Sequence, residues 1–254
     1  MISNYKVAFY TCLFGRYDFI SNPNKELIKK FNFYIITNQN STSFANWKKI
    51  YVNKKNYNNF LLSRYYKFFF HEKIKRYDYS VYFDANVHLK NNFVELLGKF
   101  INSNKEIGLF KHSSRKNIYQ ELEVNLANKN IKEIDKEKIL KLYKKKKYCS
   151  YNDLSENCVI LRKHNSKKLF KTMNNWWNLL RFYVKRDQIL LPYVLWKYKT
   201  PKIFFNINLR KKNKYLFIVP HYRFNIIQNF KTIVYINLNF IFKLLNYFNE
   251  KKFK

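Results

Sequence analysis

The sequence predicts a layered α/β fold. Short apolar segments of strand character alternate along the chain with amphipathic segments of helical character, which is the pattern of a sheet covered by helices. The chain has 254 residues, of which 47% are hydrophobic, so it can bury one large core. With 3 glycines, at positions 15, 98 and 108, it cannot contain a G-x-G-x-x-G dinucleotide loop, a P-loop or a G-x-S-x-G hydrolase elbow.

The predicted strands are short runs of aromatic and β-branched residues. The first run ends before the turn around Gly15, and the fourth ends at an acidic residue, Asp84. The six predicted strands are residues 5–12, 32–38, 48–52, 77–84, 106–111 and 156–162.

The predicted helices have apolar residues at spacings of three and four, as in residues 58–71. Residues 115–147 are highly charged and are expected to form two helices that join near Asn130. Pro192 is expected to kink or shorten the last helix of the domain, because proline has no backbone N–H to donate. The other predicted helices are residues 91–102, 164–184 and 186–196.

The chain is strongly basic, with 50 Lys and Arg against 16 Asp and Glu and a net charge of +34. The basic residues are spread along the chain, and Lys144 to Lys147 form the one run of four. A spread charge is typical of a solvated surface and favours a general attraction to anionic surfaces over a dedicated nucleic-acid site. A basic, aromatic-rich RNA-binding protein is therefore kept as an alternative, and no dedicated nucleic-acid partner is expected.

Cysteine usage and the N-terminal segment bear on localisation. The three cysteines, at positions 12, 149 and 158, have no C-x-x-C spacing and are odd in number, which favours a reducing compartment. Residues 1–15 have no long apolar run of the kind found in a secretory signal. The sequence therefore predicts a cytoplasmic protein, with peripheral contact at the inner face of a membrane as a further expectation.

Asp84 and Asn86 follow the fourth predicted strand directly. Ligands of layered α/β sheets bind beyond the carboxyl ends of the strands, and Asp84 lies at such an end. A carboxylate and an amide oxygen two residues apart can converge on Mg²⁺ or Mn²⁺, which prefer hard oxygen ligands. The alternative is that Asp84 caps the following turn.

Further charged residues precede and follow this motif. Arg64 and Lys67 lie three apart on the helix before the fourth strand, so they project from one face and could bind a diphosphate. Asp187 and Gln188 begin a later apolar helix, where an aspartate can also act only as a helix cap. Both interpretations of Asp187 stay open at the level of sequence.

Taken together, these segments resemble a glycosyltransferase-like family, formerly a domain of unknown function, that includes plant mucilage-related proteins and bacterial polysaccharide enzymes. The resemblance is ordered and covers roughly residues 5–225. The stretches that carry it are KVAFYTCLFGRYD (6–18), FYIITN (33–38), SRYYKFFFH (63–71), YDYSVYFDANVHLK (77–90), HSSRKNIYQE (112–121), ENCVILRKHN (156–165), WW (176–177) and RDQILLPYVLWK (186–197).

The resemblance implies a GT-A-like fold, in which a Rossmann-like nucleotide-binding mixed sheet is flanked by helices. It also implies transfer of a sugar from a nucleotide-sugar donor, and it assigns residues to that reaction. The implied donor-binding residues are Tyr10, Thr11, Asn38, Arg64, Lys67, Asp84 and Asn86. The implied acceptor and sugar residues are His112, Arg115 and Asn157, and the implied catalytic residues are Asp187 and Gln188.

The resemblance also implies a metal site for Mn²⁺ or Mg²⁺, formed by Asp84, Asn86 and a late histidine, for which His221 is the candidate. The function it implies is a glycosyltransferase with a UDP-linked donor and a glycan or lipid-linked acceptor, acting in surface polysaccharide synthesis. A catalytically inactive GT-A-like scaffold is the second alternative to this function.

The C-terminal part changes character, and we expect a domain over residues 1–225 followed by a tail over residues 226–254. The tail combines bulky apolar residues with lysines and contains one acidic residue, Glu250. Read as a helix, it places Ile233, Phe240 and other apolar residues on one face, which is typical of a segment that lies on an anionic membrane. Packing of this helix back on the domain is the alternative.

Overall fold

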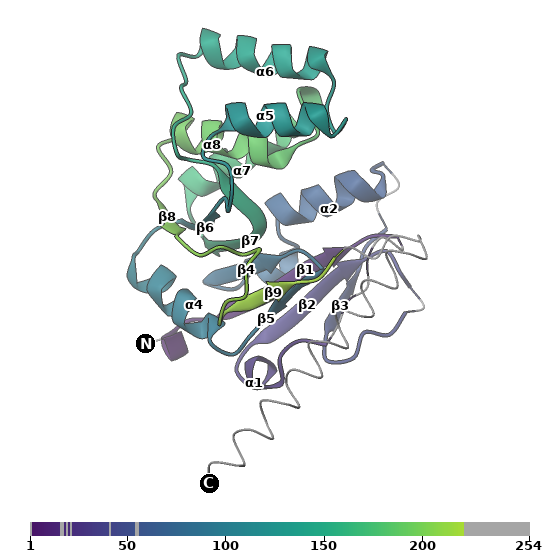
Figure 1. Cartoon of the computed structure of the whole chain (residues 1–254). Helices are drawn as coiled ribbons and strands as arrows, with labels where there is room; N and C mark the ends of the chain where they lie inside the picture. Colours follow the sequence, from purple (N-terminus) through teal and green to yellow (C-terminus); the bar gives the residue numbers. More distant parts are fainter. Residues whose placement is uncertain are drawn as a thin grey trace.

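The computed structural model of the chain describes residues 2–15, 18, 20, 22–40, 42–53 and 56–220 (Figure 1). The predicted tail over 226–254, its boundary near residue 225 and His221 lie outside the described residues. No helix among the described residues is both long enough and apolar enough to span a membrane.

A mixed sheet of seven strands forms the centre of the fold, in the order β3-β2-β1-β4-β7-β6-β8. β7 runs antiparallel to both of its neighbours, and the other four pairings are parallel. The strands are β1 (Val7–Leu13), β2 (Asn32–Thr37), β3 (Lys48–Tyr51), β4 (Tyr79–Phe83), β6 (Ile107–Lys111), β7 (Ser155–Lys163) and β8 (Lys202–Phe205). The carboxyl ends of the six other strands therefore share one edge of the sheet with the start of β7.

Three helices cover one face of the sheet and two more pack outside them. α2 contacts α7 and β1, α8 contacts α7 and β7, and α5 contacts α8 on the outside, followed by α6 (Figure 1). These helices are α2 (Asn59–Phe68), α5 (Ile118–Ala127), α6 (Glu133–Lys145), α7 (Lys167–Phe182) and α8 (Asp187–Lys197). Trp176 of α7 stacks on Phe68 of α2 with ring centroids 3.9 Å apart, so the aromatic residues of this face are core.

The other face of the sheet is covered by smaller elements. α4 (Phe93–Asn102) packs on β7 and against the short 3-10 helix η1 (Ile2–Asn4). β5 (Val87–Leu89) pairs with β9 (Leu216–Ile218) as a separate two-stranded sheet, which returns the end of the described chain to the end of β4. The short helices α1 (Lys25–Ile28) and α3 (Glu72–Lys75) complete the described elements.

The α/β prediction is confirmed, and so are the six predicted strands. The charged region 115–147 divides into α5 and α6, as expected, because the first ends at Ala127 and the second begins at Glu133. Of the two effects expected of Pro192, a kink or a shorter helix, the second does not occur: α8 continues through Pro192 to Lys197. Pro192 and its neighbours are buried, so packing of the helix outweighs the loss of one backbone hydrogen bond.

Candidate active site at the carboxyl edge of the sheet

The carboxyl end of α2 is attached to the sheet by a buried arginine. Arg162 of β7 is fully buried and donates hydrogen bonds to the carbonyl oxygens of Lys67 (2.8 Å) and Phe68 (3.0 Å). Arg162 also donates to the hydroxyl of Tyr10. The last carbonyls of a helix lack partners within the helix, and a cation there is favourable. Arg162 therefore fixes the position of Lys67.

Four charged side chains meet beside the ends of β1 and β4, and we call them the four-charge cluster: Arg64, Lys67, Asp84 and Asp187. Lys67 Nζ lies 2.8 Å from Asp187 Oδ2 and 3.7 Å from Asp84 Oδ1, and Arg64 Nε lies 3.9 Å from Asp187 Oδ2. The side chain of Lys67 is 2% exposed and that of Asp84 is 28% exposed. The ammonium group is therefore enclosed, whereas the carboxylate of Asp84 reaches solvent.

Asp187 is held as a carboxylate by its neighbours. Burial alone would raise its pKa, but the charges of Lys67 and Arg64 outweigh burial, and the pKa lies well below its ordinary value. The residue at the N-cap of α8 is Arg186, and Asp187 is the first residue of the helix. The indole N–H of Trp176 donates to the backbone oxygen of Asp187 at 2.9 Å. Asp187 therefore does more than cap a helix: it is a fixed negative charge.

Asp84 and Asn86 have different environments. The hydroxyl of Tyr82 donates to Asp84 Oδ1 at 2.6 Å, on the same carboxylate that Lys67 approaches. Asn86 is buried, and its Nδ2 donates to the carbonyl of Val219 at 2.8 Å, while Val219 N donates to the carbonyl of Asn86 at 3.0 Å. Asn86 thus attaches the end of β9 to the end of β4.

Of the three predicted metal ligands, the described residues contain Asp84 and Asn86. Within the described part of the chain, no group of three or more His, Cys, Asp or Glu side chains lies close enough to hold a metal ion. Asp84 and Asn86 contribute one carboxylate, already engaged by Tyr82 and Lys67, and one amide. The third predicted ligand, His221, lies outside the described residues, so we derive no chemical step through a metal.

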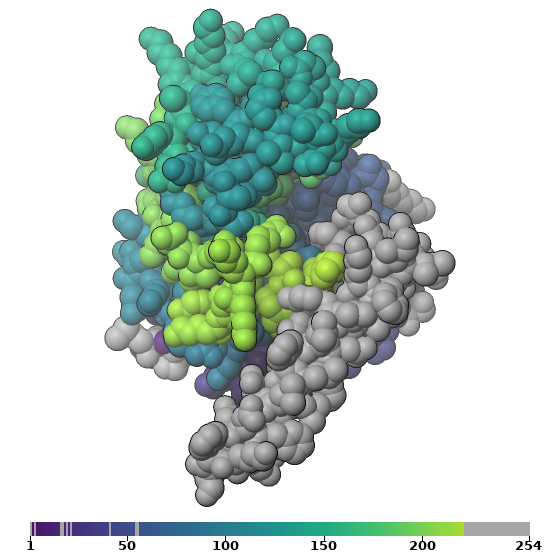
Figure 2. All heavy atoms as spheres, viewed as in Figure 1, coloured from purple at the N-terminus to yellow at the C-terminus, as the bar shows by residue number. Residues whose placement is uncertain are grey.

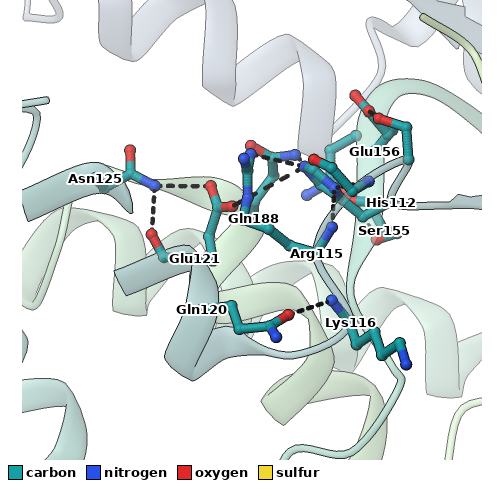
Figure 3. A network of polar contacts seen from close by, with 12 residues as sticks. His112, Arg115, Lys116, Gln120, Glu121, Asn125, Ser155, Glu156 and Gln188 are labelled. Atoms are coloured by element: carbon teal, nitrogen blue, oxygen red, sulfur yellow. Dashed lines mark hydrogen bonds and ion pairs between the residues drawn. The ribbon is translucent and has the colours of Figure 1, made fainter. Parts of the chain in front are cut away.

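A second polar network, shown in Figure 3, lies at the end of β6 and the start of α5, and we call it the His112–Arg115 network. Arg115 Nε donates to Glu121, and Arg115 Nη2 lies 2.8 Å from His112 Nε2. Asn125 donates to Glu121 at 2.7 Å, so the buried carboxylate is satisfied from two sides. Burial lowers the pKa of His112, so its ring is neutral near pH 7.

The first two residues of α8 connect the two groups of charges. Asp187 belongs to the four-charge cluster, and Gln188 Nε2 donates to the backbone oxygen of Ser155 at 3.3 Å. The hydroxyl of Ser155 donates to Asn157 Oδ1 at 2.7 Å. The Nδ2 atom of Asn157 is buried and has no hydrogen-bond partner among the described residues. These side chains therefore lie between the four-charge cluster and the His112–Arg115 network.

Tyr10, Thr11 and Asn38, the other residues predicted to bind the donor, lie outside the four-charge cluster. The side chains of Tyr10 and Thr11 are fully buried, and the hydroxyl of Tyr10 donates to the backbone of Tyr66 at 3.2 Å. The positions of both side chains argue against contact with a donor, because each lies before the strand end and faces a core. Asn38 accepts from Gly15 N (2.9 Å) and donates to Asn59 (3.0 Å), so it joins the turn after β1 to the start of α2.

Sequence reasoning missed two buried acids of this edge, Glu121 and Glu156. Both are less than 3% exposed, and each pairs with an arginine: Glu121 with Arg115 and Glu156 with Arg210. Acidic residues are scarce in this chain, so an acidic residue inside a predicted strand, such as Glu156, could have been identified as a candidate site residue. The position of Arg210 has no such signal, because it depends on the path of the chain between β8 and β9.

Comparison with known families decides the classification. The family described as TOD1/MUCI70, glycosyltransferase-like domain, matches residues 1–224. The chain belongs to this family. The TOD1/MUCI70 match contains the four-charge cluster and the His112–Arg115 network, together with all described elements. A comparison with curated proteins finds no match.

Solved structures similar to this TOD1/MUCI70 chain include three glycosyltransferases. The apo structure of WbbM, a bifunctional glycosyltransferase, has a TM-score of 0.43 and 12% identity over 80% of this chain and 39% of WbbM. A glycosyltransferase involved in glycosylation of the major capsid of PBCV-1 has a TM-score of 0.42 and 11% identity, over 79% and 81% of the two chains. Mouse xyloside xylosyltransferase 1 has a TM-score of 0.42 and 10% identity, over 79% and 84%.

Proposed function

We propose that this chain transfers a sugar from a nucleotide-sugar donor, UDP-linked, to a glycan or lipid-linked acceptor. The single observation that carries the proposal is the four-charge cluster at the carboxyl edge of the sheet, where α/β proteins bind nucleotides. An ion pair on an open surface would not support the proposal. In this cluster the ammonium group of Lys67 is enclosed, and the carboxylate of Asp84 reaches solvent, where a donor can contact it. Membership of a glycosyltransferase-like family supports the same reaction class.

In this proposal the donor lies over Asp84, with its diphosphate toward the cations of α2. Departure of the nucleoside diphosphate leaves positive charge on the anomeric carbon. Asp187 stays ionised beside that position, because Lys67 and Arg64 lower its pKa. A fixed carboxylate stabilises a developing cation more than a neutral ground state, which is the requirement for catalysis.

The His112–Arg115 network forms the acceptor side of the proposed site. The ring of His112 is neutral, but its Nδ1 accepts from the backbone N–H groups of Ser114 (3.2 Å) and Arg115 (3.1 Å), and its Nε2 faces Arg115. Nδ1 is thus engaged and Nε2 is covered by Arg115, so in this proposal His112 positions Arg115 on the acceptor side and does not remove the proton of the acceptor hydroxyl. Gln188 and Asn157 supply the amides between acceptor and donor.

The experiment that tests the proposal is release of UDP from a panel of UDP-sugars, with the purified full chain and with added Mn²⁺, Mg²⁺ or EDTA. A requirement for Mn²⁺ or Mg²⁺ is part of the proposal, and it rests on the sequence alone. The reaction with EDTA tests this requirement. Asp187→Asn should lower release by about two orders of magnitude or more, and Glu137→Gln, on the exposed surface of α6, is the matched control. Binding of UDP-sugars without release in every condition would favour the inactive scaffold instead.

A role in surface polysaccharide synthesis adds a membrane to the proposal. The tail over residues 226–254 would contact anionic lipid and bring the site near a lipid-linked acceptor. Deletion of residues 226–254 should abolish sedimentation with vesicles of anionic lipid at low salt and leave UDP release unchanged. Vesicle binding by the folded, shortened chain would refute the role of the tail.

A further inference from the structure

The segment between β8 and β9 brings an arginine to the carboxyl edge of the sheet. The yellow-green surface in Figure 2 shows that this last described part of the chain lies exposed below α5 and α6. The side chain of Asn208 accepts from the backbone N–H groups of Arg210 (2.9 Å) and Lys211 (3.2 Å), which forms a tight turn. The turn presents Arg210 toward the start of β7.

A buried carboxylate holds Arg210 in place. Glu156 is 1% exposed, and its Oε2 lies 2.9 Å from Arg210 Nη2, while Arg210 Nε lies 3.4 Å from Oε1. The hydroxyl of Ser113 donates to the same Oε1 at 2.7 Å, which fixes the carboxylate. Paired N–H donors on one carboxylate give a guanidinium group a defined orientation.

Arg210 lies beside the candidate donor site. The backbone N–H of Asp84 donates to the carbonyl of Cys158, and Glu156 lies two residues before Cys158 in β7, about 7 Å closer to the carboxyl edge of the sheet. Partial burial lowers the pKa of Arg210, but Glu156 and, with a smaller effect, Asp84 outweigh it and raise the pKa. The guanidinium group is therefore within the electrostatic field of Asp84.

One side of the guanidinium group is open. The side chain of Arg210 is 57% exposed, and its contacts with Glu156 engage Nε and Nη2, on one side of the guanidinium group. Lys67, in contrast, is enclosed by the carboxylates of the four-charge cluster. Of these two cations, Arg210 is the one whose N–H groups can contact a ligand over Asp84 without a rearrangement of the core.

We propose that Arg210 binds the diphosphate of the nucleotide-sugar donor and that Glu156 is its positioning residue. The inference rests on the proposed function and adds a phosphate-binding residue to it. Glu156 fixes one side of the planar guanidinium group, and the opposite N–H groups are then directed at phosphate oxygens. Arginine suits this role because two parallel N–H groups match the oxygens of a phosphate.

The test is titration calorimetry of the full chain with UDP and with uridine, which lacks phosphates. Arg210→Gln should weaken UDP binding at least tenfold and leave uridine binding unchanged. Arg210→Lys should weaken UDP binding less, because it keeps the charge and loses the paired donors. Lys211→Gln, a neighbouring exposed cation, is the matched control and should bind UDP like the unchanged chain.

Glu156→Gln tests the positioning role. It should weaken UDP binding in the same direction as Arg210→Gln and raise the KM for the UDP-sugar while kcat changes little, and combining the two substitutions should add little. Equal UDP binding by the unchanged chain and Arg210→Gln would overturn the inference while the proposed function stands. If the unchanged chain binds no nucleoside diphosphate at all, the proposed function fails and this inference fails with it.

Discussion

Lys67 Nζ lies 2.8 Å from Asp187 Oδ2, and this contact joins the last turn of α2 to the first residue of α8. The side chain of Lys67 is 2% exposed and that of Asp187 is 11% exposed, so the pair is buried. In a buried pair each charge depends on the other for its solvation. The same contact therefore holds two helices together and keeps a carboxylate ionised at the candidate site.

The first prediction concerns Asp187→Asn. The substitution removes the charge that would act on the developing cation, so turnover of a UDP-sugar should fall by about two orders of magnitude or more, with little change in donor affinity. It also leaves the ammonium group of Lys67 with Asp84 alone, which should lower the free energy of unfolding by about 3 kcal/mol. Steady-state kinetics and urea denaturation measure the two effects.

A double variant separates those two effects. Replacing Lys67 by methionine in the Asp187→Asn background removes the uncompensated charge and should recover part of the lost stability, but no activity. If the single variant turns over and binds its donor like the unchanged chain, Asp187 has no catalytic role.

The second prediction is that Asp84→Ala abolishes turnover of the donor and leaves the fold intact. The side chain of Asp84 is 28% exposed and Lys67 keeps its closer partner, Asp187, so removal of the Asp84 carboxylate costs little stability. Circular dichroism should be unchanged and UDP release should be absent. Normal turnover by the folded variant would exclude Asp84 from the donor site.

The third prediction concerns Asn86→Asp, for which the structure changes the expectation. From the sequence alone, a carboxylate at this position is expected to keep or strengthen the dependence of activity on Mn²⁺ or Mg²⁺. In the structure Asn86 Nδ2 donates to the carbonyl of Val219, and a carboxylate there would oppose that oxygen. The loss of a buried hydrogen bond should cost about 1–3 kcal/mol. Thermal denaturation should show it, and an unchanged melting temperature would contradict this role for Asn86.

The sequence predicted most of the strands, because each is an apolar run with clear ends. It also identified Arg64, Lys67, Asp84 and Asp187 from their places beside strand and helix ends. It did not predict that Lys67 is the shared partner of both aspartates, because that contact depends on how α2 and α8 pack. The pairing of Glu156 with Arg210 could not be predicted either, because it depends on how the segment between β8 and β9 packs against β7.

Tyr10 is a predicted site residue whose side chain lies in the core. The family resemblance assigned it to the donor site, but the alternation of side chains along β1 turns it toward α2. The buried Arg162 that binds its hydroxyl was not predicted, since a cation in a strand is normally expected at the surface. Tyr10 and Arg162 bind backbone carbonyls at the end of α2, those of Tyr66 and of Lys67 and Phe68, respectively.

The last prediction concerns the stability of the fold between pH 6.5 and 4. His164 stacks on Phe70 with ring centroids 4.1 Å apart, and its Nδ1 lies 3.4 Å from the carbonyl of Lys75. Burial lowers the pKa of His164 to about 4, with a further contribution from the charge of Arg162. Between these pH values the unfolded chain binds a proton that the folded chain does not, so the free energy of unfolding should fall as the pH falls. The loss from this group should reach about 3 kcal/mol.

His164→Asn tests this, because asparagine keeps an N–H donor near Nδ1 and does not titrate. The variant should be less stable at pH 7.5, since the stacking on Phe70 is lost. From pH 7.5 to 4, however, it should lose about 3 kcal/mol less than the unchanged chain, and urea denaturation at both pH values measures the difference. His112, whose pKa burial also lowers, contributes to both proteins and cancels in the comparison. The same loss in both proteins would show that His164 does not set the response to acid in this range. The effect of Asp187 lies in a separate window below about pH 4, because its pKa is lowered from an ordinary acidic value.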